Sequence, residues 1–336
     1  MKIAIIPKPG TVHQKAHGAN KRIFYLAQGL QKKGHQVKLF ASSDSEILQG
    51  VEHIKWEKPR RKDYVAKIDY VSEAIQKSQD VDIINCQADH LSLPFSIWSK
   101  PPILHTLIYG RLPESVVEFL ESHNKDYFLT ISNFLKKRYP GLNYQGTIYN
   151  ALDKDLFPYT EEKENFFLYL ARISQDKQNH LAIEWAKKYS FKLYLAGPIN
   201  DQKYFEERIE PFLDDNVIYL GNLHFDEKIK YLSQARATFM LDDMEGFGNS
   251  TIESLACGTP VIGFNNGAFP EIVEHMKDGY ILKDLEDIKN AIKFIGQIKS
   301  TECRKKIEQR FDIDQMVDEY EKMYLKIIEK HENRNR

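Results

Sequence analysis

The chain has 336 residues, which is long for a single hydrophobic core and suits two domains of about 150 residues each. Its hydrophobic content of 42% and charged content of 28% are ordinary for a globular enzyme. The formal net charge is −1, so the chain as a whole has no electrostatic attraction to nucleic acid, and no nucleic-acid partner is expected.

Strand and helix patterns alternate through the first half of the sequence. The run Ile3–Ile6 predicts a buried strand, and it is too short before Pro7 to be the apolar core of a signal peptide. Apolar residues at helical spacing from Ile23 to Leu30 predict a helix that ends at Gly34. Further strands are expected at Val37–Phe40, Asp82–Asn85, Ile103–Leu107 and Tyr127–Ile131, and Ser132 is expected to cap the next helix.

A polar, turn-rich segment near Asn150 separates this series from a second one. The second series predicts strands at Phe167–Leu170, Lys192–Ala196, Val217–Leu220, Thr238–Leu241 and Val261–Phe264. Asp226 is expected to cap the helix that precedes the fourth of these strands. The region Ile313–Ile328 predicts one long amphipathic helix, followed by a frayed tail from Lys330 to Arg336. Apolar strands that alternate with helices predict α/β domains with parallel sheets covered on both faces.

Cysteine usage and hydropathy suggest a cytoplasmic protein. The three cysteines, Cys86, Cys257 and Cys303, are far apart, and they predict neither a disulfide framework nor a zinc site. Prolines and Lys100 interrupt the apolar stretch 91–110, so it is not a spanning helix. The basic cluster Lys58–Lys62 leaves three interpretations open: a solvated loop, contact with an anionic acceptor, and peripheral contact with a membrane surface.

The stretch from Met244 to Val273 carries the most informative motif. Two carboxylates, Glu245 and Glu253, flank a turn made of Gly246, Phe247, Gly248, Asn249, Ser250 and Thr251. A strand pattern precedes this turn and a helix pattern follows it, so backbone N–H groups at a helix N-terminus can bind an anion. Ionised carboxyl groups accept hydrogen bonds from hydroxyls. A nucleotide sugar, which has a diphosphate between hydroxyl-bearing groups, matches this arrangement.

Ser250 and Glu253 also fit a purely structural pattern. The sequence S-x-x-E is a capping box, in which Ser250 would cap the helix and Glu253 would bind the cap residue's backbone N–H. The two roles of Glu253 do not exclude each other, and both stay open at this point.

The segment resembles the E-x7-E signature of retaining glycosyltransferases, in particular glycosyltransferase family 4. The run Ala256–Ile262 and the pair Pro270-Glu271 are similar to the family pattern as well. Gly246 departs from it, because proline is frequent at that position. The resemblance implies that Glu245 contacts hydroxyls of the donor sugar, that Glu253 contacts the ribose, and that the amides of the intervening turn hold the sugar and phosphates.

The resemblance implies the GT-B fold, an α/β architecture of two Rossmann-like domains facing across a cleft, with a C-terminal helix that crosses back to the first domain. The expected acceptor-binding domain is 1–151 plus about 316–336, and the expected nucleotide-sugar-binding domain is 152–315.

Arg172 and Lys177 follow the first strand of the second series, and parallel α/β sheets place ligands at such carboxyl ends. Fixed cations there would stabilise the negative charge of a departing diphosphate. The segment resembles the family motif G-R-[IL]-x-x-x-K, with Ala171 in place of glycine, and we assign the diphosphate role to both residues on that resemblance.

Three further positions have open roles. Gly18 opens the first helix and would let a phosphate or sugar approach the backbone, while a plain helix-entry turn is the alternative. His17 and Tyr109 are candidates for the acceptor side; Tyr109 lies where the family has T-x-H-G. Leu223 is a candidate base contact, because the family shapes its nucleobase pocket with this turn, and loop packing is the alternative.

The resemblance therefore implies a retaining hexosyltransferase that moves a sugar from a nucleotide-diphosphate donor, with UDP favoured, to an acceptor hydroxyl. The acceptor, whether glycan, lipid-linked or small molecule, stays open. We expect no cofactor and no metal, since Arg172 and Lys177 can neutralise the phosphates. Two alternatives remain: an inactive sugar-nucleotide-binding or scaffold protein, and a phosphorylase-like enzyme on the same fold.

Overall fold

The computed structural model describes residues 1–15, 19–57 and 64–335. The chain divides into two compact units. The first unit is Met1–Ala151 with Ile313–Arg336, and the second is Leu152–Asp312. The returning segment thus begins at Ile313 rather than at about residue 316.

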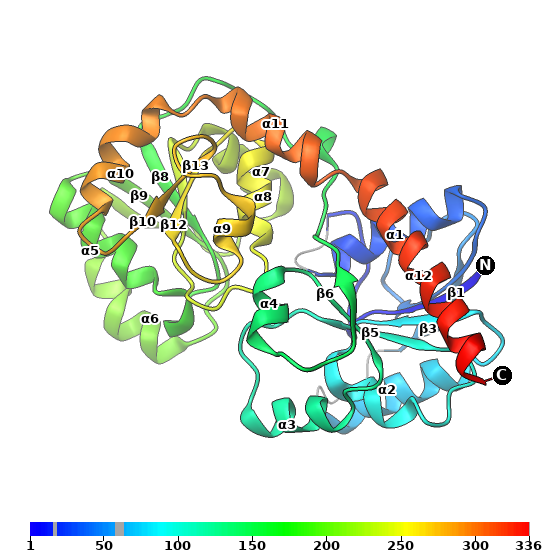
Figure 1. Cartoon of the computed structure of the whole chain (residues 1–336). Coiled ribbons are helices and arrows are strands. Elements are labelled where there is room, and N and C mark those ends of the chain that lie inside the picture. Colours follow the sequence, from blue (N-terminus) through cyan, green and yellow to red (C-terminus); the bar gives the residue numbers. More distant parts are fainter. Residues whose placement is uncertain (16–18, 58–63, 336) are drawn as a thin grey trace. The chain divides into compact units, whose positions relative to one another are not determined.

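The first unit contains a seven-stranded parallel sheet in the order β3-β2-β1-β4-β5-β6-β7. Figure 1 labels β1, β3, β5 and β6 of this sheet. Its strands are β1 (Lys2–Ile6), β2 (Gln36–Ser42), β3 (Glu52–Trp56), β4 (Ile83–Cys86), β5 (Ile103–Leu107), β6 (Tyr127–Thr130) and β7 (Tyr144–Thr147). Its helices are α1 (Ala19–Lys32), α2 (Tyr64–Gln76), the 3₁₀ helix η1 (Asp89–Phe95), α3 (Glu114–Ser122), α4 (Asn133–Arg138) and α12 (Ile313–Asn335).

The second unit contains a six-stranded parallel sheet in the order β10-β9-β8-β11-β12-β13. Its strands are β8 (Phe166–Leu170), β9 (Lys192–Ala196), β10 (Val217–Tyr219), β11 (Ala237–Met240), β12 (Val261–Phe264) and β13 (Gly279–Leu282). Its α-helices are α5 (Asn179–Tyr189), α6 (Gln202–Arg208), α7 (Phe225–Gln234), α8 (Asn249–Ala256), α9 (Phe269–Ile272), α10 (Ile288–Phe294) and α11 (Ser300–Arg310). Its 3₁₀ helices are η2 (Lys154–Leu156), η3 (Gln175–Lys177), η4 (Glu210–Phe212) and η5 (Ile295–Gln297).

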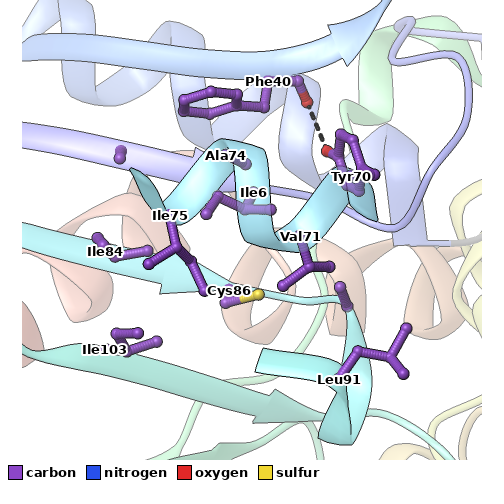
Figure 2. Packing of buried hydrophobic residues seen from close by; sticks show 12 residues of the cluster. Ile6, Phe40, Tyr70, Val71, Ala74, Ile75, Ile84, Cys86, Leu91 and Ile103 are labelled. Carbon is purple, nitrogen blue, oxygen red and sulfur yellow. Dashed lines mark hydrogen bonds between the residues drawn. The ribbon is translucent and has the colours of Figure 1, made fainter. Parts of the chain in front are cut away.

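Buried apolar side chains join α2 to one face of the first sheet (Figure 2). Val71, Ala74 and Ile75 of α2 pack against strand residues that include Ile6 and Ile84. Tyr70 belongs to the same cluster, and its hydroxyl donates to the backbone oxygen of Phe40 at 3.1 Å. The near-continuous apolar strands follow from this burial, because helices cover both faces of a parallel sheet. The prediction of two parallel α/β sheets is confirmed.

Helix α12 belongs to the first unit, where it runs alongside α1 (Figure 1). A Cβ atom on Gly29 of α1 would lie 2.4 Å from Cγ2 of Val317, so the absence of a side chain permits this approach. Glu321 accepts hydrogen bonds from Lys33 and His35 at 2.6 Å each. The predicted frayed tail is wrong, because α12 continues to Asn335.

Two predicted helix boundaries are confirmed and one is wrong. Ser132 caps α4 by accepting from the N–H of Leu135, and Gly34 follows α1 with a left-handed φ of 86°. Asp226 does not cap α7. The cap residue is His224, whose backbone N–H is bound by the Glu227 carboxylate at 3.1 Å, and Asp226 lies in the first turn.

Three strands, β3, β7 and β13, were not predicted, and each lies at an edge of its sheet. In each sheet the chain first adds strands on one side of its first strand and then continues on the other side. In the first sheet this reversal lies between β1 and β4, and in the second between β8 and β11. Open parallel sheets bind ligands at such switch points, outside the carboxyl ends of the strands. In the second unit this position lies between β8 and β11.

Candidate functional site

The loop after β8 carries Arg172 and Lys177 in different environments. Arg172 is half-exposed, and its Nη2 lies 3.1 Å from the carboxylate of Asp176. Lys177 ends η3, and its side chain is only 13% exposed. The hydroxyl of Tyr169 in β8 donates to the backbone oxygen of Lys177. The backbone that carries the ammonium group is therefore tied to the neighbouring strand.

The loop after β11 carries Glu245 and, closer to the strand, Asp242. Asp242 is buried, and its Oδ1 accepts the N–H of Met244 at 2.8 Å. Sequence reasoning did not identify Asp242. Its place directly after an apolar strand is the signal that could have pointed to it, because functional groups gather at these ends in parallel sheets.

The two loops meet at the ammonium group of Lys177. Its Nζ lies 2.5 Å from Oδ2 of Asp242 and 2.7 Å from Oε2 of Glu245. An ammonium group has three N–H donors, and these contacts use two of them. The structure therefore brings the predicted residues Lys177 and Glu245 into direct contact.

The carboxylates keep Lys177 charged. Burial alone would lower the pKa of Lys177, but the nearby charges of Glu245 and Asp242 and their hydrogen bonds outweigh it, so its pKa lies above the ordinary value. Within this loop pair, the site thus offers a permanent cation and a partly exposed carboxylate side by side.

Helix α8 begins beside these loops with a glycine. Gly248 is the cap residue, with a left-handed φ of 96°, and the N–H groups of Thr251 and Ile252 bond to its backbone oxygen. The predicted capping box is wrong, because Ser250 already lies inside the helix. A left-handed cap without a side chain leaves the first amides of the helix accessible to an anion.

The predicted turn residues contribute unequally. The side chain of Phe247 is 2% exposed and packs edge-to-face on Phe311, with ring centroids 5.9 Å apart. Thr251 is also buried, whereas Asn249 and Ser250 are partly exposed. Phe247 and Thr251 can therefore offer a ligand only their backbone, while Asn249 and Ser250 present side chains as well.

Glu253 has a buried partner that the sequence did not reveal. Its Oε2 lies 3.0 Å from Nζ of Lys228 on α7, and the two side chains are 6% and 3% exposed. The carboxylate joins α8 to α7, so Glu253 has a structural contact other than the predicted capping box.

A glycine from another turn supports the backbone of Glu245. Gly267, between β12 and α9, has a φ of 57°, and a Cβ atom there would lie 2.9 Å from the backbone oxygen of Glu245. The same oxygen accepts the N–H of Ala268 at 3.0 Å. Close packing thus fixes the main chain at Glu245.

The remaining predicted residues lie on other loops. Leu223 precedes α7 and is partly buried. Tyr109 follows β5 and is 42% exposed, with the ammonium of Lys8 located 3.6 Å from its ring centroid. His17, Gly18 and the cluster Lys58–Lys62 lie outside the described residues, so their predicted roles stay predictions.

Among residues 1–15, 19–57 and 64–335, no group of three or more His, Cys, Asp or Glu side chains is arranged to hold a metal ion. In that same part of the chain, no helix combines the length and apolar composition needed to cross a bilayer. A pocket of about 460 Å³ in the second unit is lined mainly by residues of α5, including His180, together with Arg208 of α6 and Phe212 of η4, and it contains none of the predicted site residues.

Comparisons with known proteins relate this chain to glycosyltransferases. Residues 153–311 match the family model described as glycosyl transferases group 1. An uncharacterized glycosyltransferase of Methanocaldococcus jannaschii is 26% identical over 282 residues, covering 77% of each chain. The N-acetyl-alpha-D-glucosaminyl L-malate synthase of Bacillus anthracis is 26% identical over 129 residues, which span 36% of this chain and only 33% of that relative.

Solved structures share the whole fold. The sucrose-phosphate synthase of Thermosynechococcus elongatus superposes with a TM-score of 0.80 at 18% identity, covering 98% of this chain and 99% of the other. HepE of Anabaena, solved in complex with UDP and glucose, gives a TM-score of 0.76 at 16% identity, covering 96% and 98%. The chain therefore has the GT-B architecture, its relatives indicate a glycosyltransferase, and residues 153–311 in its second unit match the family glycosyl transferases group 1.

Proposed function

We propose that this enzyme transfers a sugar from a nucleoside-diphosphate sugar to an acceptor hydroxyl with retention of configuration and without a metal ion. The donor binds the second unit, and UDP is the favoured nucleotide. The observation that carries this proposal is the contact between Lys177 and Glu245 at the switch point of the second sheet, beside the N-terminus of α8. A cation for a phosphate and a carboxylate for sugar hydroxyls stand next to each other there.

Each group has a distinct task in this proposal. The free N–H of Lys177, together with Arg172 and the first amides of α8, stabilises the negative charge that develops on the departing diphosphate. Glu245 accepts hydrogen bonds from the sugar hydroxyls. The bond from the anomeric carbon to the diphosphate oxygen breaks, the acceptor oxygen forms the new bond on the same face, and its proton passes to the departing diphosphate.

The choice of UDP is supported by HepE, which was solved with UDP and glucose and shares the fold. The acceptor is a glycan, a lipid-linked sugar or a small molecule with a free hydroxyl, and peripheral contact with a membrane would accompany a lipid-linked acceptor.

A thermal-shift panel of UDP, GDP, ADP and UDP-glucose, each with EDTA or Mg²⁺, tests donor binding and metal independence. Saturating ligand should stabilise the protein by about 3 kcal/mol at a hundredfold excess over the dissociation constant, equally with EDTA and Mg²⁺. If none of the nucleotides raises the melting temperature, the proposed donor site is wrong.

Substitution at Glu245 then tests the sugar contact. Glu245→Ala should abolish release of UDP from UDP-glucose while the fold and the binding of UDP itself persist. Glu286→Ala is the matched control, because this carboxylate is 81% exposed on the same unit, and it should leave the reaction unchanged. A Glu245→Ala enzyme with undiminished turnover would remove Glu245 from the mechanism.

A further inference from the structure

Asp242 connects the two loops of the donor site through a single buried carboxylate. Its Oδ1 accepts the N–H of Met244, which fixes the turn that leads to Glu245, and its Oδ2 contacts Lys177 Nζ at 2.5 Å. The side chain is 7% exposed. A carboxylate so far from water persists only with good partners, and here both oxygens have one.

A second connection holds the same two loops in register. Nε2 of Gln178 donates to the backbone oxygen of Leu241 at 3.0 Å. Gln178 has a left-handed φ of 53°, which is uncommon for a residue other than glycine. Such strain persists where the surrounding contacts determine the conformation, and it is frequent at functional sites. The Lys177 backbone is therefore constrained on both sides, and only its ammonium group needs orientation.

We propose that Asp242 is a positioning residue for the transfer reaction: it holds the ammonium group of Lys177 between the two loops, so that one N–H remains directed to the donor diphosphate and Glu245 remains available to the sugar. This inference rests on the proposed function and assigns a residue that the E-x7-E pattern does not contain.

The charge balance explains why a second acid is needed. With Glu245 as its only close partner, Lys177 would form a closed pair, and the hydroxyl-binding carboxylate would be occupied. Asp242 shares the ammonium group and also offsets the cost of burying it. Among the described residues, the charged and titratable groups near Lys177 are Asp242, Glu245 and Asp176, together with the phenol of Tyr169, which donates to the backbone oxygen of Lys177.

The first test needs no ligand. Trace acetylation with acetic anhydride across the alkaline pH range, read by mass spectrometry of the peptide that contains Lys177, gives the titration midpoint of this lysine in the whole protein. Asp242→Asn should lower the midpoint by about one pH unit or more, because an opposite charge in contact is lost. Asp243→Asn, the exposed neighbour with the same change in charge, should leave it unchanged. An unaltered midpoint in Asp242→Asn overturns the proposal.

The second test uses UDP as the probe, with calorimetric titration at about pH 7 and about pH 10.5. The pKa of Lys177 lies above its ordinary value of about 10.5, and Asp242→Asn should lower it by about one unit or more, so the variant loses the charge of Lys177 within this range while the wild type largely keeps it. The affinity of Asp242→Asn relative to the wild type should therefore fall by about threefold or more between the two pH values, whereas that of Asp243→Asn should not change. A loss in Asp242→Asn that is equal at every pH would mean a purely structural role and would overturn the proposal. If the wild type binds no nucleotide at all, the proposed function fails, and the acetylation profile alone still decides whether Asp242 controls Lys177.

Discussion

The buried ion pair between Lys228 and Glu253 separates a structural role of Glu253 from a functional one. The two groups lie 3.0 Å apart with 3% and 6% exposure. At an effective dielectric constant of about 20, their attraction is about 5 kcal/mol, most of which offsets the cost of removing both charges from water. Lys228→Met would leave the carboxylate buried without the ammonium group of Lys228, and we expect it to lower the free energy of unfolding by about 3–5 kcal/mol.

Replacing both members of the ion pair should restore the stability that Lys228→Met alone removes. Replacing both members, as in Lys228→Met with Glu253→Leu, removes two charges together, and such replacements are often neutral or stabilising. The expected stability of the double variant is therefore within about 1 kcal/mol of the wild type. If this stable variant no longer binds UDP, Glu253 has two contacts in the wild type, one with Lys228 and one with the nucleotide. If it binds UDP normally, the role of Glu253 is structural.

Urea unfolding measures these energies in the second unit. Trp185 is buried in that unit, and the other two tryptophans, Trp56 and Trp98, lie in the first unit. In a background that carries Trp56→Phe and Trp98→Phe, the tryptophan fluorescence therefore reports unfolding of the second unit alone. Lys230→Met, at an exposed position of the same helix, should change stability by less than about 0.5 kcal/mol. If Lys228→Met lowers the free energy of unfolding by less than about 1 kcal/mol, the reasoning is wrong, because such a small loss is typical of a solvent-exposed ion pair.

Two further predictions concern stability. Burial lowers the pKa of Lys163 to about 8, so between about pH 8 and its unfolded value of about 10.5 the unfolded chain binds more protons. The free energy of unfolding of the wild type, relative to that of Lys163→Met, should therefore rise by about 2 kcal/mol across this window, after allowance for partial exposure of the lysine. Urea titrations of both proteins at several pH values measure this difference, and a difference that stays constant with pH would refute the prediction. Gly29→Ala should destabilise by about 1–3 kcal/mol, against the usual benefit of alanine in a helix, because the new Cβ would lie 2.4 Å from Val317. Thermal unfolding should show recovery in Gly29→Ala with Val317→Ala, and a stabilised single variant would contradict the packing argument.

The sequence predicted the central strands and missed edge strands for a physical reason. A central parallel strand is covered on both faces and reads as a nearly continuous apolar run, as in β1 and β8. An edge strand needs less apolar cover, and in β3 no residue is buried, because Glu52 and Lys55 are exposed and the other residues are partly buried. In β13 the first residue is Gly279, where a Cβ atom would lie 2.4 Å from the backbone oxygen of Val261. Glycine weakens a strand signal, although here close packing of the backbone requires it.

Local patterns also failed where tertiary contacts decide the outcome. The S-x-x-E pattern at Ser250 and Glu253 is compatible with a capping box, but the helix starts earlier because glycine adopts the left-handed cap at Gly248. Glu253 is then placed on the buried side of α8, where Lys228 binds it. No spacing rule pairs residues 228 and 253, since the contact depends on how two helices pack against one sheet. Lys177 and Asp242 met for the same reason, through neighbouring strands that are distant in the chain.

The same strand order leads to different chemistry in the two units. In the first sheet, the position between β1 and β4 is occupied by a guanidinium from within the chain: Arg22, 2% exposed, donates to Gln87, which directly follows β4, and to Asn150 at 2.6 Å. These partners bind the two terminal nitrogens of the guanidinium, while Nε of Arg22 and Nε2 of Gln87 are buried without a hydrogen-bond partner among the described residues. In the second sheet, the equivalent position holds the cluster of Lys177, Asp242 and Glu245, in which the described residues use two of the three N–H donors of Lys177. The two positions also differ in exposure, because Arg22 is buried whereas the side chain of Glu245 is 25% exposed. A switch point can bind a ligand only where the ligand can reach its polar groups, and this difference supports the proposal that the donor binds the second unit.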